Sequence, residues 1–316
     1  ELADDIEYHN FIQFLFFKQW GDVKRYANEN GIKIIGDIPI FVAADSSDAW
    51  ANPEIFLFDE ERKPVKVAGV PPDYFSATGQ LWGNPLYNWQ KLKETNYSWW
   101  VERVRANLST CDIIRIDHFR GFEAYWAVPY GDDTAINGQW EPGPGIDLFN
   151  AIKSQLGELP IIAEDLGLMT QGVIDLREAT GFPGMKILGF AFDSGEENDY
   201  LPHTYTKNCV VYTGTHDNDT LIGWFQKAKE EDRQFARDYL NSRSDDEIHW
   251  DAIRGAWSSV ANMAISPVQD FLGLGSEARI NTPGVAAGNW QWRLKHGVLT
   301  DELAERIAKL TKVYSR

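Results

Sequence analysis

The sequence predicts an α/β fold, and within that class a (β/α)8 barrel of the TIM type with inserted helical segments. Short apolar runs recur along the 316 residues, and helical stretches separate most of them. These runs are four to eight residues long and rich in Ile, Val or Phe, which is typical of buried parallel strands. The predicted strands are residues 33–40, 112–117, 160–165, 186–192, 209–215 and 260–266.

Helical patterns account for much of the remaining chain. Residues 5–30 predict a helix that ends at Gly31 and carries a broad apolar face. This face consists of Phe11, Leu15, Phe16, Trp20, Val23 and Tyr26. Residues 149–156 and 171–180 predict shorter helices, and residues 221–260 predict two amphipathic segments separated near residues 242–245.

The position of the acidic residues favours a barrel over an open doubly wound sheet. Each of five predicted strands ends at an acid, and these residues are Asp37, Asp117, Glu164, Asp193 and the His216–Asp217 pair. In a closed barrel all strand ends meet at one mouth, whereas in an open sheet only two or three would meet. An acid at one such position could be a helix N-cap, but five caps are a weaker explanation.

The number of predicted strands is six, and a closed barrel of this type needs eight. Six parallel strands alone would leave edge strands with unpaired backbone groups. We therefore expect residues 1–316 to be one catalytic barrel domain that lacks its N-terminal strands, with residues 43–110 inserted into it. The missing N-terminal part of the same protein is then an expected partner.

Composition narrows the class of ligand. Thirty Lys and Arg against 47 Asp and Glu give a formal charge of −17, which argues against nucleic acid as a partner. No apolar run approaches the length of a membrane span. The 13 Trp, 12 Tyr and 17 Phe suit a sugar ligand, although core packing is the more ordinary use of aromatic residues. Cys111 and Cys209 form no disulfide or metal-binding pattern.

Two segments predict a pair of carboxyl groups with different protonation states. Arg115 and Asp117 point to the same side of one strand, where the guanidinium would keep the carboxylate ionised, as a nucleophile requires. Glu164 ends a strongly apolar strand, which raises the pKa of a carboxyl group and suits a general acid. Asp165 faces the other way and is expected to pair structurally. A purely structural Arg–Asp pair remains the alternative for the first segment.

A third acid, Asp217, follows His216. No second His lies at metal-ligand spacing, so we expect no metal, and His216 is interpreted as a hydrogen-bond partner for a hydroxyl group. An ionised Asp, a protonated Glu and a third acid together are typical of a retaining glycosidase-type site, which needs no cofactor.

Several long segments also resemble the amylomaltase family, the 4-α-glucanotransferases or disproportionating enzymes. They are GDIPIFVAADSSDAW (36–50), GVPPDYFSATGQLWGNPLY (69–87), RIDHFRG (115–121), AEDLG (163–167), GTHDNDT (214–220), QDFLGLGSEARINTPG (269–284) and GNWQWR (288–293). The resemblance runs from about Lys33 to the C-terminus. Family members carry a longer N-terminal portion that includes the first two barrel strands, which this chain lacks.

The resemblance implies a role for each matching residue. Asp117 would be the nucleophile, Glu164 the general acid/base and Asp217 the stabiliser of the transition state. The implied substrate-binding residues are Arg115, His216, Asp37, Tyr74, Phe75, Trp82, Asn281 and Asp193. The implied substrates are maltooligosaccharides and α-1,4-glucans, and the implied location is the cytoplasm, or a plastid for a plant protein.

Residues 69–87 match what looks like the family's lid over the acceptor side. Transfer rather than hydrolysis requires water to be excluded from the covalent intermediate, and Gly69, Gly79 and Gly83 suit hinges of such a loop. A rigid, proline-stiffened loop is the alternative. Two other functions remain open, namely an amylase-type hydrolase and a non-catalytic glucan-binding fragment.

Overall fold

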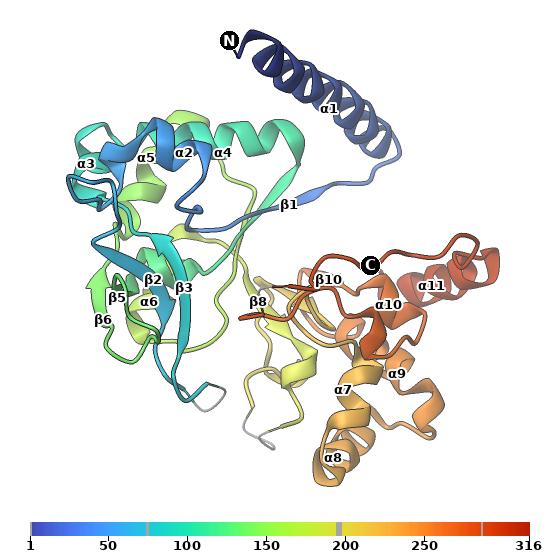
Figure 1. The fold of residues 1–316 in the computed structure, drawn as a ribbon. Helices are drawn as coiled ribbons and strands as arrows, with labels where there is room; N and C mark the ends of the chain where they lie inside the picture. The colour runs from blue at the N-terminus through green and yellow to red at the C-terminus, as the bar shows by residue number, and fades with distance from the viewer. Residues whose placement is uncertain (1, 74–75, 194–197, 286) are drawn as a thin grey trace. The chain divides into compact units, whose positions relative to one another are not determined.

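The computed structural model describes residues 2–73, 76–193, 198–285 and 287–316. The chain divides into two compact units, Glu1–Phe182 and Pro183–Arg316 (Figure 1). Each unit is described by itself below.

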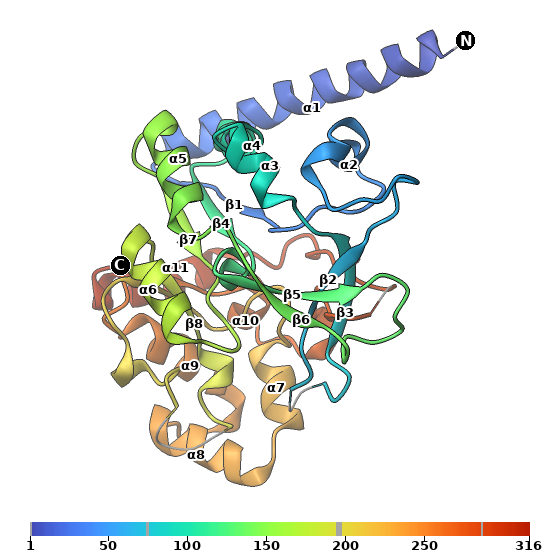
Figure 2. The same ribbon diagram turned by 90° about the vertical axis from the view of Figure 1, so that its left-hand side faces the viewer.

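A three-stranded parallel sheet forms the centre of the first unit. Its order is β1 (Ile35–Ile38), β4 (Ile113–Ile116) and β7 (Ile161–Ala163). Ile114, Ile116 and Ala163 are fully buried, as a parallel sheet covered on both faces requires. In Figures 1 and 2, helices α4 (Ser98–Thr110) and α5 (Ile146–Leu156) lie on one side of these strands. Helix α6 (Gln171–Thr180) follows β7 and has the predicted bounds.

The first unit also contains a four-stranded antiparallel sheet that the sequence did not predict. Its order is β3 (Gln80–Pro85), β2 (Lys66–Val70), β5 (Ala124–Pro129) and β6 (Gln139–Pro142). Its strands come from both sides of β4 in the sequence. Strand β2, which lies within the predicted insertion 43–110, pairs with β5, which lies beyond it. Short helices α2 (Ser47–Ala51) and α3 (Trp89–Glu94) complete this part of the unit.

Residues 69–87 are largely a β-hairpin, because β2 and β3 pair with each other on either side of the turn. Gly69 lies within β2, where a Cβ atom would come within 2.6 Å of the carbonyl oxygen of Gln80. Close packing of β2 on β3 therefore requires this glycine, and the hinge role expected of Gly69 stays a prediction. Gly79 and Gly83 have φ angles of +70° and +78°, which glycine adopts without strain.

Many of the aromatic residues of the first unit form its core. Trp100, Phe119 and Phe122 are fully buried, and Trp100 packs edge-on against Phe122 with ring centroids 5.4 Å apart. The ordinary interpretation of the aromatic composition, core packing, therefore holds for these residues.

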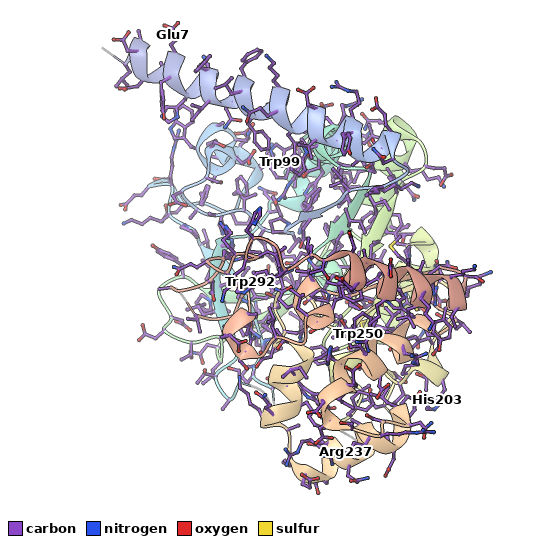
Figure 3. The ribbon with its side chains drawn as sticks, turned by 90° about the vertical axis from the view of Figure 1, so that its right-hand side faces the viewer. Glu7, Trp99, His203, Arg237, Trp250 and Trp292 are labelled. Carbon is purple, nitrogen blue, oxygen red and sulfur yellow. The ribbon has the colours of Figure 1, made fainter. Side chains whose placement is uncertain are left out.

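Helix α1 (Ala3–Glu29) matches the predicted helix, but none of its residues is buried. Its C-terminal half contacts α4 and the loop after it: Trp20 Nε1 donates to the carbonyl oxygen of Thr110 at 2.7 Å, and Lys24 lies 3.5 Å from Asp112. The N-terminal half, which carries Glu7, extends beyond the other elements of the unit (Figure 3). The apolar face of this half is exposed, with Phe14 at 60%.

The second unit contains a second three-stranded parallel sheet. Its order is β10 (Met263–Ile265), β9 (Cys209–Tyr212) and β8 (Gly184–Ile187). The six predicted strands are therefore confirmed as parallel strands, three in each unit. The run 186–192 was placed too late, because β8 ends at Ile187 and residues Leu188–Phe190 form a 3-10 helix.

The helices of the second unit pack on this sheet. Residues 221–260 form three helices rather than the predicted two, which are α7 (Leu221–Lys227), α8 (Glu230–Leu240) and α9 (Ile248–Trp257). The chain is extended at Ala228 and Lys229, which separates α7 from α8. Trp250 of α9 lies among the helices (Figure 3). The guanidinium of Arg237 on α8 lies 5.2 Å from the ring centroid of Phe225 on α7. Helices α10 (Val268–Phe271) and α11 (Asp301–Tyr314) complete the unit.

Within the described part of the chain, no helix combines the length and the apolar character that crossing a membrane requires.

Candidate active site

An ion-paired triad occupies the C-terminal ends of β1 and β4. Asp37 lies directly opposite Arg115 in the register of the two strands. Nη1 of Arg115 donates to both carboxylate oxygens of Asp37 at 2.8 and 2.7 Å, and it lies 3.0 Å from Oδ1 of Asp117. The side chain of Arg115 is 8% exposed, whereas Asp37 and Asp117 are 40% and 36% exposed. The buried guanidinium of Arg115 therefore forms ion pairs with two partly exposed carboxylates, those of Asp37 and Asp117.

The electrostatics of this triad favour full ionisation of Arg115. Burial disfavours the charged guanidinium, but the carboxyl groups of Asp37, Asp117 and Glu164 outweigh burial and raise the pKa of Arg115. A cation of this kind stabilises the ionised form of a neighbouring carboxyl group such as that of Asp117.

Glu164 follows β7 directly and is only 8% exposed. Its Oε2 accepts the backbone N–H of His118 at 2.7 Å, and its Oε1 accepts that of Leu166 at 2.8 Å. Burial, followed by the charge of the nearby Asp117, raises the pKa of Glu164 to about 7, although Arg115 and the two N–H groups oppose the shift. The structure therefore agrees with the raised pKa that the apolar strand predicts.

Asp165 points away from Glu164, as the sequence predicts. Its Oδ2 accepts a hydrogen bond from Nη1 of Arg177 on α6 at 2.5 Å, and its side chain is 5% exposed. Asp165 therefore pairs structurally with the helix that follows β7.

A second cluster lies in the second unit, on the loop between β9 and α7. Nε2 of His216 lies 3.3 Å from Oδ2 of Asp217, and Nδ2 of Asn281 donates to Oδ1 of Asp217 at 2.6 Å. The backbone of Asn281 also donates to the carbonyl oxygen of His216 at 3.1 Å. The structure thus brings together His216, Asp217 and Asn281, three of the residues that the sequence singled out.

Two residues of this cluster were missed. Nη2 of Arg279 donates to the carbonyl oxygen of Asp217 at 2.6 Å, and the ring of Trp290 lies 5.2 Å from that of His216. Both residues fall within or beside the segments quoted for the family resemblance, 269–284 and 288–293, so position in a matching segment was the available signal.

A buried carboxylate, that of Asp270, binds both ends of the loop between β9 and α7. Asp270 is 1% exposed; its Oδ2 accepts the hydroxyl of Thr213 at 2.6 Å and its Oδ1 accepts the backbone N–H of Leu221 at 2.9 Å. Thr213 and Leu221 flank the loop that carries His216 and Asp217. Asp270 was also missed, since nothing in a single sequence distinguishes it from an ordinary helix-start acid.

The remaining predicted residues have varied positions. Trp82 lies on β3, with its ring edge-on to that of His118 at 4.8 Å. Asp193 accepts a hydrogen bond from Nδ2 of Asn198 at 3.3 Å, but it does not end a strand, because β8 ends six residues earlier. Tyr74 and Phe75 lie outside the described residues.

His118 is a further residue that the sequence did not single out by itself. It has a left-handed backbone with φ +50° and ψ +51°, which is uncommon for a residue other than glycine. Burial, with a smaller contribution from Arg120, lowers the pKa of His118 to about 3, so its imidazole is neutral.

No three His, Cys, Asp or Glu residues are grouped so that they could hold a metal ion, within residues 2–73, 76–193, 198–285 and 287–316. In the first unit, the two carboxyl groups that can take part in chemistry are those of Asp117 and Glu164. One is paired with a cation, and the other retains a proton near neutral pH; this combination suits nucleophilic attack and proton donation at a glycosidic bond.

Comparison with known proteins gives one consistent result. The family model described as 4-alpha-glucanotransferase (Glyco_hydro_77) matches residues 1–300. The 4-alpha-glucanotransferases of Clostridium butyricum and Synechocystis sp. are each 55% identical to this chain over 318 residues, and that of Thermus thermophilus is 50% identical over 322 residues. Each match covers 100% of this chain but 65%, 63% and 64% of the respective relative. The chain therefore spans less than two thirds of the length of these relatives.

Solved structures agree. An amylomaltase from Streptococcus agalactiae in complex with acarbose is 42% identical, with a TM-score of 0.97 over 100% of this chain and 64% of that one. An amylomaltase from Corynebacterium glutamicum, 20% identical, shares the fold with a TM-score of 0.80 over 95% of this chain and 49% of that one. The barrel-type α/β fold class predicted from the sequence is thereby confirmed.

Proposed function

The chain belongs to the 4-alpha-glucanotransferase family, and from this premise we propose that it carries the reacting groups of an enzyme that transfers α-1,4-glucan segments between maltooligosaccharides. The observation that carries the proposal is the contrast between two carboxyl groups of the first unit. Asp117 lies 3.0 Å from a buried guanidinium, while burial raises the pKa of Glu164 to about 7.

In the first step, Asp117 attacks the anomeric carbon of the donor glucan. The bond from this carbon to the glycosidic oxygen breaks as the bond to Oδ of Asp117 forms. Glu164 gives its proton to the departing oxygen, which leaves as a 4-hydroxyl group. Arg115 keeps Asp117 ionised, and the nucleophile therefore needs no separate base.

The second step reverses these roles. The 4-hydroxyl of an acceptor glucan gives its proton to the Glu164 carboxylate while its oxygen attacks the anomeric carbon, and the ester bond to Asp117 breaks. Water in place of the acceptor would give hydrolysis. Transfer thus requires an acceptor held over the intermediate, and the hairpin of β2 and β3, with Trp82, is proposed for this role together with Tyr74 and Phe75.

The cluster of the second unit is proposed to bind the donor sugar. Asp217 supplies a carboxylate for the hydroxyl groups and for the positive charge that develops at the anomeric carbon. His216 binds hydroxyls of the same ring, and Asn281 holds Asp217 through the 2.6 Å hydrogen bond. Asp37 orders Arg115, and Asp193 is proposed as a further binding position near the donor sugar.

The proposal includes a further segment that completes the enzyme. The relatives are longer than this chain by more than a third of their own length. In the described residues β1 has a partner strand on one side only, and α1 exposes many apolar side chains. Among these are Ile6, Phe14, Phe17 and Tyr26, exposed by 58%, 60%, 55% and 71%. Exposed apolar surface of this extent marks a region that another segment covers.

In this proposal, which follows the family resemblance, the covering segment is the missing N-terminal part of the same protein, and residues 1–316 with the insertion 43–110 belong to one catalytic barrel domain. A cytoplasmic location belongs to the same proposal and rests on the family resemblance alone.

The test is a chimera in which this chain replaces the 318 matching residues of the Clostridium butyricum relative. Incubated with maltotriose, it is expected to convert two molecules into glucose and maltopentaose, followed by longer products. The chain alone is expected to show no turnover, because α1 and β1 lack their cover. The matched controls are the parent relative and the chimera with Asp117→Asn.

The outcomes separate the candidate functions. Glucose and maltose without longer products would identify a hydrolase. Binding of maltotriose without turnover by a folded chimera, when the parent relative is active, would identify a non-catalytic glucan-binding protein and overturn the proposal. Full transfer by the isolated chain would overturn only the need for a further segment.

A further inference from the structure

His118 has a backbone conformation that its residue type does not favour. The left-handed region costs a side chain with a Cβ atom, and such a conformation persists only where the surroundings enforce it. His118 lies between β4 and the 3-10 helix Phe119–Phe122, directly after Asp117. Two contacts of its imidazole ring identify the surroundings that enforce it.

The first contact is with Trp82 of β3. The two rings meet edge to face, with centroids 4.8 Å apart and an interplanar angle of 78°. Aromatic pairs favour this arrangement over a face-to-face stack. The indole is itself oriented, because Trp82 Nε1 donates to Oε1 of Gln80 at 3.1 Å.

The second contact is with Gly121. A Cβ atom at this position would lie 3.1 Å from Cδ2 of His118 and 2.7 Å from Cδ1 of Ile40. Gly121 therefore leaves room for the imidazole to lie against the backbone of the 3-10 helix. The ring is thus held by contacts with both this backbone and Trp82, which restrict the backbone of His118 as well.

These contacts fix the direction in which the backbone N–H group of His118 points. The backbone N–H of His118 reaches Oε2 of Glu164 at 2.7 Å, while Leu166 N–H reaches Oε1. Each oxygen of the carboxyl group thus accepts one backbone donor. A general acid/base must keep its geometry while it loses and regains a proton, and backbone donors fix it more firmly than a mobile side chain would.

We propose that His118 is a positioning residue through which Trp82, on the strand proposed to face the acceptor, holds the carboxyl group of Glu164 in place. This inference rests on the proposed function for the roles of Trp82 and Glu164. It adds a mechanical link between them: a glucan that displaces Trp82 shifts the imidazole, the left-handed turn and the donor to Oε2 together.

The other charged groups around Glu164 are separate from this link. Asp117 and Arg115 come from β4 and its end, Asp37 of β1 faces Arg115, and Asp165 is paired with Arg177 of α6. Arg120 lies near His118 and 3.6 Å from Glu123. Substitutions at Trp82 and His118 leave all of these groups in the chain.

The experiment measures the pKa of Glu164 in the intact 316-residue chain by NMR with 13C-labelled glutamate, the signal being assigned from its loss in Glu164→Gln. Three variants are compared, Trp82→Leu, His118→Val and His118→Gly. Loss of an N–H donor to a carboxylate raises its pKa, so Trp82→Leu and His118→Val are expected to raise that of Glu164 by about one pH unit. His118→Gly is expected to raise it less, because glycine adopts φ +50° without strain.

Trp50→Leu is the matched control, since this indole is 77% exposed, and it is expected to leave the pKa of Glu164 unchanged. The proposal is overturned if Trp82→Leu shifts the pKa by no more than Trp50→Leu does, and this variant alone decides if His118→Val does not fold. The titration needs no turnover. It therefore separates failure of this link from failure of the proposed transferase activity, which the chimera reports.

Discussion

Asp37 and Arg115 face each other across β1 and β4, and one guanidinium nitrogen of Arg115 donates to both carboxylate oxygens of Asp37. The same nitrogen lies 3.0 Å from Asp117, so the strand register itself places the cation beside the proposed nucleophile. Orientation of Asp117 is therefore a property of the sheet rather than of a loop, which is how a precise site is best supported.

Replacing Arg115 by Met should affect activity more than stability. Asp37 and Asp117 are 40% and 36% exposed, so water can hydrate both carboxylates once the cation is gone. The free energy of unfolding is expected to fall by about 1–2 kcal/mol, less than for a pair buried on both sides. The kcat of the chimera is expected to fall about 100-fold or more, because the charge beside Asp117 is lost.

The measurements are urea unfolding of the chain and turnover of maltotriose by the chimera. Arg105→Met is the control, because Arg105 is 53% exposed and pairs with Glu102 on the helix surface. It is expected to change stability by less than about 0.5 kcal/mol. A wild-type kcat for Arg115→Met would contradict the proposed role.

Glu164 should make the folded chain less stable as pH rises. Its folded pKa of about 7 lies above the ordinary value of 4.5, so the folded state binds more protons than the unfolded state between these values. Stability from this group is therefore lost as pH increases from about 4.5 to 7, by roughly 3 kcal/mol in all. Glu164→Gln removes the titration and is expected to be more stable than the wild type at pH 8 but not at pH 4.

Urea unfolding at several pH values measures this difference. Glu60→Gln serves as control, because Glu60 is exposed in a turn. Parallel stability profiles for the wild type and Glu164→Gln would show that the carboxyl group titrates normally.

Introducing a negative charge in place of the amide that donates to Asp217 should reduce activity more than removing this amide. In Asn281→Asp, a carboxylate takes the place of the amide that donates to Oδ1 of Asp217 at 2.6 Å, and the two like charges repel. At pH 8 the chimera with Asn281→Asp is expected to be about tenfold slower than that with Asn281→Ala. The gap should narrow towards pH 5, where one of the two carboxyl groups can take up a proton.

The readout is kcat for maltotriose across this pH range. Asn241→Asp at the exposed end of α8 is the control, because Asn241 has a left-handed backbone that Asp tolerates. Equal rates for the Asp and Ala variants of Asn281 at pH 8 would mean that this hydrogen bond does not orient Asp217.

The sequence predicted the parallel strands well because their burial leaves continuous apolar runs such as Ile161–Ala163. The same signal misplaced β8, since Leu188 and Phe190 continue the apolar run into a 3-10 helix, and apolar character alone does not distinguish the two. The antiparallel sheet was missed because it pairs strands from both sides of β4 in the sequence, such as β2 with β5.

In the candidate site, too, some features could be predicted from the sequence and others could not. Asp117 and Glu164 could be predicted because each follows an apolar strand directly, whereas Asp217 lies on the loop that follows the apolar strand β9. The backbone donors to Glu164, from His118 and Leu166, could not, because a donor without a side chain leaves no trace in residue type. Contacts such as that from Arg279 to the Asp217 carbonyl bridge residues far apart in sequence, and only the folded chain brings them together.

Asp270 should stabilise the loop that carries His216 and Asp217, and truncation of its side chain tests this role. Asp270→Ala leaves the N–H of Leu221 and the hydroxyl of Thr213 without their acceptor in a buried place. The free energy of unfolding is expected to fall by about 2–4 kcal/mol. The chimera should also lose activity, because the loop between Thr213 and Leu221 carries His216 and Asp217.

A double-mutant cycle with Thr213→Val sharpens the test. If the 2.6 Å hydrogen bond links the two side chains, Asp270→Ala and Thr213→Val together should cost less than the sum of the single changes. Asp270→Asn should be milder than Asp270→Ala, because an amide oxygen can still accept from Leu221. Burial raises the pKa of Asp270, so the neutral amide also avoids the cost of ionising this position at high pH. Additive costs, with full activity in Asp270→Ala, would show that the loop keeps its shape without this support.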